Sequence, residues 1–245
     1  MVESALWGFV GGGALLVGAA IGLHLHPSAA LVGRVMAFGA GALICAMTLE
    51  LTVDAFRGGG RAPFVLGLLA GCGVYYLGDR LIERRLGPLD LDADTGSSDA
   101  ATMGKAVKVV LGSVLDGIPE AAAIGLSVAN GAGVSYALVV AVCISNVPEA
   151  LMPSVDLRAA GQSKGRIYAI WAGLAGVSAL CALGGYLILG ALPDPIDSFA
   201  EAFAAGAVLT MLSMLFLPEA VERAGRSVGI WTVLGYALAT LLTIG

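Results

Sequence analysis

Apolar residues occur along the chain in long runs, and short polar breaks separate the runs. A helix needs about 20 mostly apolar residues to cross a bilayer, and most of these runs have that length. The pattern predicts an all-α integral membrane protein with eight transmembrane helices in a single domain, residues 1–245. The expected spans are Ser4–Gly22, Ala29–Phe56, Ala62–Ile82, Lys105–Val128, Val134–Asp156, Arg166–Gly190, Phe199–Glu222 and Ser227–Ile244.

One connection is longer and more polar than the others and runs from about Glu83 to Gly104. Its aspartates, glycines and serines predict a solvated linker. The acidic run also has the chemistry to collect cations, although a simple hydrophilic loop explains it equally well.

Basic residues predict the orientation, because cytoplasmic loops of membrane proteins accumulate Lys and Arg. With the N-terminus outside, only Arg57 and Arg61 lie on the external side. We therefore expect a multi-pass protein of the cell membrane with both termini external. The N-terminus lacks the basic stretch of a signal peptide, so the first apolar run is interpreted as a retained span. The basic residues that then lie in cytoplasmic loops and flanks are Arg34, Arg80, Arg84, Arg85, Lys105, Lys108, Arg158, Lys164, Arg166, Arg223 and Arg226.

An internal repeat links the second and seventh predicted spans. Residues 37–43 match residues 202–208, and the same register pairs Asp54-Ala55 with Glu219-Ala220. The two spans run in opposite directions, which indicates an inverted-topology repeat. The prediction is a 3+2+3 arrangement, with helices 1–3 and 6–8 as the repeats around helices 4 and 5.

Composition agrees with a membrane protein. Hydrophobic residues make up 58% of the chain and charged residues 13%, against about 25% charged residues in soluble domains. No basic patch with interleaved aromatics indicates nucleic acid binding. The 36 glycines, several spaced four apart, predict close helix packing and are compatible with a monomer or a homodimer.

Two related motifs in the fourth and fifth spans carry the strongest chemical signal: Asp-Gly-Ile-Pro-Glu-Ala at 116–121 and Ser-Asn-Val-Pro-Glu-Ala at 145–150. Each glutamate lies near the middle of its predicted span, where an ionised carboxylate costs several kcal/mol unless it has a partner. Neither span core contains a basic residue. Pro119 and Pro148 each bend a helix and free a backbone carbonyl. A cation from solution is the partner that the motifs predict.

Spacing places the polar side chains of each motif on one helix face. Asp116 and Glu120 are four residues apart, and Asn146 and Glu149 are three apart. Together they offer three carboxylates and an amide, an oxygen-rich set that suits a hard or borderline divalent ion. The alternative from the residues alone is a pair of protonated, hydrogen-bonded structural acids or a proton relay.

These features resemble the ZIP (Zrt- and Irt-like) family of metal transporters. That family has eight spans, external termini, a long cytoplasmic loop between spans three and four, and metal sites built from His-Asn-x-Pro-Glu-Gly-like and His-Glu-x-Pro-Glu-Gly-like motifs. The resemblance implies that Glu120 and Glu149 are ligands, beside Pro119 and Pro148. It also implies uptake of a divalent transition-metal cation as substrate, by alternating access, with no prosthetic group and no enzymatic activity.

The chain departs from the family pattern in its histidines. Asp116 stands where the first motif usually has His, and Gly117 where it has Asn; Ser145 and Asn146 stand where the second motif has His and an acid or amide. The expected ligands are Asp116, Glu120, Asn146 and Glu149, with Ser145 as a secondary one. Without imidazole the site is harder, so manganese or ferrous iron is as plausible a substrate as zinc.

Further polar residues predict a cation path across the membrane. Glu50 and Asp54 are expected near the external mouth, and Glu219 and Glu222 near the cytoplasmic exit. The other expectation is that such terminal acids only mark the interface, as we also expect for Asp79. His24 and His26 lie on the first cytoplasmic turn, as secondary ligands or as structural residues.

Three other functions fit the same residues: a metal-binding sensor or transport-dead relative, an intramembrane enzyme that uses two acids, and a transporter of another cation or small solute. Direct ATP drive is not supported, because the chain has no nucleotide-binding loop.

Overall fold

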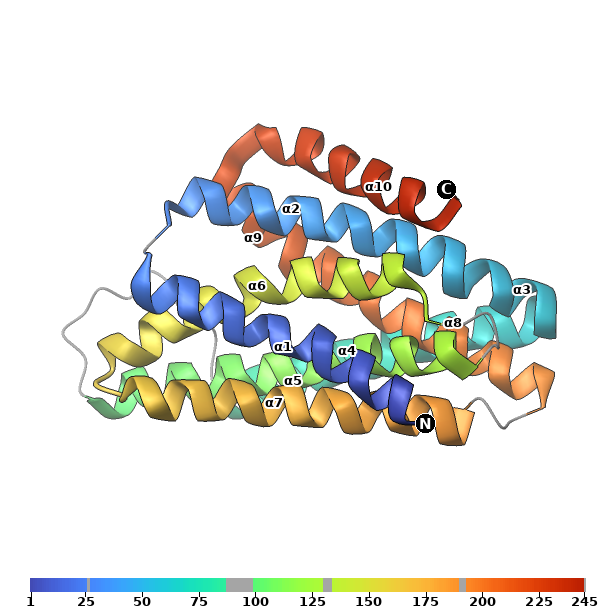
Figure 1. Ribbon diagram of the computed structural model, residues 1–245, viewed down its shortest axis with the longest axis horizontal. Coiled ribbons are helices and arrows are strands. Elements are labelled where there is room, and N and C mark those ends of the chain that lie inside the picture. Colours follow the sequence, from blue (N-terminus) through green and yellow to red (C-terminus); the bar gives the residue numbers. More distant parts are fainter. Residues whose placement is uncertain (26, 87–98, 130–133, 190–192, 245) are drawn as a thin grey trace.

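The computed structural model describes residues 1–25, 27–86, 99–129, 134–189 and 193–244, without the side chains of 50, 86, 99–110, 188, 189 and 194. Within these ranges every regular element is helical (Figure 1). His26 and the centre of the expected linker lie outside the described residues. The helices are α1 (Val2–His24), α2 (Ala29–Ala46), α3 (Val53–Gly59), α4 (Arg61–Leu86), α5 (Asp99–Ala129), α6 (Tyr136–Ala159), α7 (Lys164–Gly184), α8 (Asp194–Met211), α9 (Leu217–Ala224) and α10 (Val228–Ile244).

Serine caps explain where several helices begin. Ser28, Ser135 and Ser163 precede α2, α6 and α7, and each side chain accepts a hydrogen bond from a backbone N–H of the first turn, at 3.1–3.3 Å. These bonds satisfy donors that have no partner inside the helix.

Helices α4 and α5 both extend into the segment that was expected to be linker. α4 continues to Leu86 and α5 begins at Asp99. The expected span began only at Lys105, because residues 99–104 add little hydropathy. These first turns contain Ala and Met, which favour helix without adding a membrane-length apolar run.

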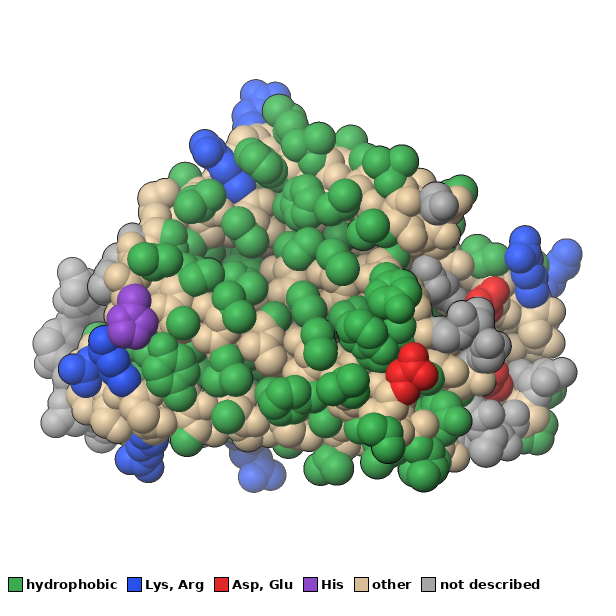
Figure 2. All heavy atoms as spheres, viewed as in Figure 1, with side chains coloured by type: hydrophobic (Ala, Val, Ile, Leu, Met, Phe, Trp, Pro, Cys, Tyr) green, Lys and Arg blue, Asp and Glu red, His purple; other side chains and the backbone are tan. Residues whose placement is uncertain are grey.

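Seven segments of the described chain are long and apolar enough to cross a membrane. The last of them, Pro195–Ile244, has 50 residues and contains a sharp turn, because Gly225 has φ +59° and begins the 3₁₀ turn η4 (Gly225–Ser227). After this turn α10 packs back along α2 (Figure 1). The surface in Figure 2 is mostly hydrophobic, with charged side chains mainly toward its two ends, as expected for a bilayer-embedded protein.

Two stretches far apart in the chain share the same succession of elements. α2 continues through the π-helix η1 (Met47–Thr52) into α3, and α8 continues through the π-helix η3 (Leu212–Phe216) into α9. Each stretch ends at a glycine with positive φ, Gly60 at +78° and Gly225 at +59°. The π-helix starts, the helix ends and these glycines are separated by the same interval, and the stretches run in opposite directions in Figure 1.

Packing divides the helices into neighbourhoods. α1 lies against α6 and α7, α4 lies along α8, and α2 lies along α10. Glycines permit the close approach: a Cβ at Gly18 would collide with the Val147 carbonyl, and one at Gly41 with the Thr232 carbonyl. The motif helices α5 and α6 lie between these neighbourhoods, and the buried apolar core surrounds them.

Candidate functional site

The two motif helices keep their helical course through the prolines. Pro119 lies inside α5, and Pro148 and Pro153 lie inside α6. Because a proline has no N–H, each one leaves a carbonyl in the preceding turn without its usual donor. The motif side chains therefore project from continuous helices next to polar backbone atoms.

Glu120 is the most deeply buried of the predicted ligands. It is 1% exposed, and neither carboxylate oxygen has a hydrogen-bond partner among the described residues. The buried Ser145 hydroxyl faces it from α6, but this hydroxyl donates to the Val142 carbonyl at 3.0 Å. A carboxyl group in apolar surroundings without a partner costs free energy in either protonation state. A group of this kind is suited to bind a cation.

Asn146 lies on the same side of the site as Glu120. Both line a cavity of about 10 Å³, the size of one water molecule. The Asn146 amide nitrogen donates to the Gly11 carbonyl of α1 at 3.0 Å. This bond turns its side-chain nitrogen toward α1, and the side-chain oxygen is the acceptor of the same amide.

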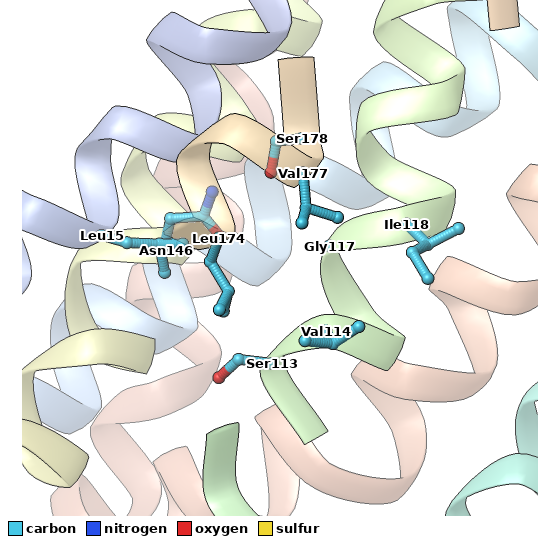
Figure 3. A pocket seen from close by; sticks show the side chains of 9 residues that line it. All are labelled: Leu15, Ser113, Val114, Gly117, Ile118, Asn146, Leu174, Val177 and Ser178. Atoms are coloured by element: carbon cyan, nitrogen blue, oxygen red, sulfur yellow. The ribbon is translucent and has the colours of Figure 1, made fainter. Parts of the chain in front are cut away.

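A second small cavity adjoins the first beside Gly117 and is shown in Figure 3. Gly117, Asn146 and Ser178 line both cavities, and Ser113 lines the second. A Cβ at Gly117 would meet only Ser178 Oγ, at 3.9 Å, so the space is open. The missing side chain at Gly117 explains this cavity.

Asp116 and Glu149 instead line a larger cavity of about 160 Å³, together with Ser113. This cavity lies toward the end of the molecule at which α4 ends and α5 begins. Five carboxyl groups and one guanidinium line it, so acidic side chains predominate in its wall. They are Asp79, Asp116, Glu149, Asp156, Glu219 and Arg223.

The four predicted ligands thus occupy neighbouring positions on α5 and α6 but divide into two pairs: Glu120 with Asn146, and Asp116 with Glu149. Among the described residues, no three His, Cys, Asp or Glu side chains are grouped as they would be around a bound metal ion. The Tyr75 hydroxyl of α4 donates a hydrogen bond to Asp116 Oδ1.

The predicted pathway residues are distributed unevenly. Glu219 lies in the large cavity, where Arg223 binds it with an N–O distance of 2.6 Å. Glu222 and Asp54 are exposed outside the cavity. His24 is exposed, with Nδ1 3.5 Å from Lys164 Nζ. The Glu50 side chain, like His26, lies outside the described residues.

Sequence reasoning missed several polar residues of this region. Asp79, which we expected to be a simple interfacial charge, lines the large cavity with Asp156 and Arg223. Tyr75 was not identified at all. Its position four residues before Asp79 puts both on one face of α4, which is the signal that could have found them together.

Comparison with known proteins gives one informative similarity. The chain is 28% identical over 252 aligned positions to a protein of Enterobacter sp. (strain 638) named "Zinc transporter ZupT", and the alignment covers 96% of this chain and 95% of that protein. No model of a known protein family matches the chain. The similarity extends over the whole fold rather than one motif.

Proposed function

We propose that this chain is a ZIP-like membrane transporter that takes up a divalent transition-metal cation through a carboxylate site on α5 and α6. One observation carries the proposal: Glu120 is buried between apolar helices, and neither of its oxygens has a hydrogen-bond partner in the part of the chain that the structure describes. A cation satisfies such a group more completely than any neighbouring side chain does. The full-length similarity to a protein named as a zinc transporter supports the same function.

In this proposal Asp116, Glu120, Asn146 and Glu149 are the ligands of the transported ion. Carboxylate and amide oxygens suit manganese, ferrous iron and zinc, and the absence of histidine in both motifs favours the harder ions. The ligands lie on neighbouring helices, so small side-chain rotations bring the two pairs together around one ion. Ser145 faces Glu120 and is the additional oxygen donor.

The proposed architecture has eight spans, with Pro195–Ile244 crossing twice through the turn at Gly225. The matching π-helices and positive-φ glycines support an inverted repeat in which α1–α4 and α7–α10 flank α5 and α6. The basic residues near the ends of α4, α6 and α9 favour a cytoplasmic location for that end. Both termini are then external.

With this orientation the large cavity faces the cytoplasm, and its carboxylates attract the ion leaving Asp116 and Glu149. Toward the external end the space between the helices is filled by buried apolar side chains, including Ile124, Leu138 and Val142. The structure then corresponds to an inward-facing state of an alternating-access cycle.

Uptake by reconstituted liposomes tests the proposal. We expect saturable uptake of at least one of Zn²⁺, Mn²⁺, Fe²⁺ and Cd²⁺ by the wild-type protein. The Glu120→Ala/Glu149→Ala variant loses at least tenfold in rate, because it retains too few anionic ligands. A Glu3→Ala/Glu83→Ala variant, which removes two exposed carboxylates outside the predicted path, retains wild-type uptake.

Failure would take a specific form. If folded, reconstituted wild-type protein moves none of the four ions faster than empty liposomes, the transport function is refuted. Binding of an ion without flux would favour a sensor instead.

A further inference from the structure

Tyr75 is an exception on its helix. Its neighbours Val74, Tyr76 and Leu77 are 55%, 42% and 59% exposed and face the lipid, whereas Tyr75 is 2% exposed. A bulky polar side chain has therefore been brought inside from a helix that otherwise covers the outer surface.

Glycines explain how Tyr75 reaches the interior. Gly67 and Gly71 precede it at intervals of four and lie on the same face of α4. A Cβ at Gly67 would lie 2.8 Å from Ala202 Cβ, and one at Gly71 would lie 2.9 Å from the Ala207 nitrogen, so only glycine lets α4 pack this closely on α8. The Tyr75 ring continues this face toward α5.

The contact between α4 and α5 forms in the same way. A Cβ at Gly78 would lie 3.2 Å from the Leu115 side chain, so the lack of one leaves room for α5. Asp116 follows Leu115, and its carboxylate accepts the hydrogen bond of the Tyr75 hydroxyl. Both groups are buried, at 2% and 9% exposure.

This hydrogen bond affects how the ligands are arranged. A hydroxyl that donates to a carboxylate makes one of the stronger hydrogen bonds in proteins. It holds Asp116 toward α4 and the large cavity, whereas Glu120, one turn later on α5, lines the small cavity with Asn146. Asp116 is thus kept apart from Glu120 and Asn146, while Glu149 lines the large cavity with it.

The bond also connects two packing neighbourhoods. Tyr75 belongs to α4, which lies along α8, and Asp116 belongs to α5, which packs most closely on α7. A cation that draws Asp116 toward Glu120 and Glu149 pulls its carboxylate away from Tyr75.

We propose that Tyr75 is a positioning residue that holds Asp116 apart from Glu120 and Asn146, and that cation binding breaks this hydrogen bond. The proposal rests on the proposed function and specifies how Asp116 is held away from Glu120 and Asn146 until an ion binds. Tyr75 competes with the ion for Asp116, which weakens binding and favours release.

Equilibrium binding of Mn²⁺ and Zn²⁺ to the purified full-length protein in detergent, followed by calorimetry, tests the competition. Tyr75→Phe keeps the ring and removes only the donor, so we expect the Kd to fall about tenfold, the worth of one hydrogen bond to a charged group. Tyr76→Phe is the matched control, since the Tyr76 hydroxyl accepts a hydrogen bond from the exposed Arg80 at 3.0 Å and lies outside the three cavities. It leaves the Kd unchanged.

A double-variant cycle distinguishes the proposed role of Tyr75 from a purely structural one. The Asp116→Asn variant binds the ion more weakly overall. Adding Tyr75→Phe to this variant does not tighten ion binding severalfold, because the charged acceptor is gone. An equal or higher Kd in Tyr75→Phe, or the same tightening in the Asp116→Asn background, overturns the proposal.

A spectroscopic measurement on the wild-type protein does not depend on how the Tyr75 variant folds. Zn²⁺ binding shifts a tyrosine absorption band to the blue, as a donated hydrogen bond is lost, and Asp116→Asn abolishes the shift. The absence of any tyrosine shift on binding overturns the proposal. If Glu120→Ala/Glu149→Ala abolishes ion binding but Tyr75→Phe leaves it unchanged, the Tyr75 proposal alone is refuted. If no version of the protein binds either ion, the proposed function is refuted as well.

Discussion

At the scale of single residues, the burial of Glu120 lowers the stability of the fold, while the same group is proposed to bind the cation. Its carboxyl group is buried and has no hydrogen-bond partner among the described side chains and backbone, which costs about 1–3 kcal/mol. Functional sites commonly keep such costs, since optimised packing would remove the binding chemistry.

We therefore expect Glu120→Met, an unbranched apolar replacement, to raise the melting temperature of the cation-free protein in detergent. The same variant loses the further rise that Zn²⁺ or Mn²⁺ gives the wild type, because a ligand is missing. Differential scanning fluorimetry with and without ions measures both effects. Glu3→Met, at an exposed carboxylate, is the control, and a Glu120→Met variant that melts lower than wild type would contradict the argument.

The predictability of the site also differs between residues. Glu120 and Glu149 could be predicted as ligands from sequence because an acid beside proline in an apolar run is costly without a function. Tyr75 and Asp79 could not, because a tyrosine in an apolar helix and an acid near its end are ordinary membrane features, and only the packing of α4 on α8 and α5 distinguishes them. The division of the ligands into two pairs follows from contacts with Gly11 and Tyr75, far away in sequence.

At the scale of elements, turns and helix irregularities shape the bundle. Hydropathy predicted where helices occur but not the π-helices η1, η2 (Gly185–Leu189) and η3, because their period differs little from that of the α-helix. It also missed the polar first turns of α5. The turn between α9 and α10 depends on Gly225, whose φ of +59° and ψ of −147° are accessible almost only to glycine.

Gly225→Ala should destabilise the protein by about 1–3 kcal/mol, because alanine is strained in this conformation. Gly173→Ala, on an exposed part of α7 with no atom near its Cβ position, should be neutral or stabilise by up to about 1 kcal/mol. Unfolding by denaturant in mixed micelles gives both values. Equal effects at the two sites would show that the turn conformation is not the cause.

At the scale of the whole molecule, the acidic cavity lies on one side of the predicted ligands and the packed apolar core on the other. Positive charge near the same end as the cavity supports the proposal that this end is cytoplasmic. Because of this asymmetry, the side of the membrane from which the site is accessible can be measured.

We expect a cysteine at Met152, which lines the cavity, to react with a membrane-impermeant thiol reagent in inside-out vesicles and not in right-side-out vesicles. The background lacks Cys45, Cys72, Cys143 and Cys181. A cysteine at Leu138, fully buried on the same helix, should react in neither. Labelling of Met152→Cys from the external side alone would reverse the orientation.

The matched π-helices indicate how the chain evolved. A π-helix is usually stabilised only where its surroundings require it, so its recurrence at the same interval, followed each time by a positive-φ glycine, is not what independent origins produce. We infer that one ancestral gene segment already encoded this irregular helix and was then duplicated. The two halves have since diverged around it, one ending in α4 with the buried Tyr75 and the other in α10.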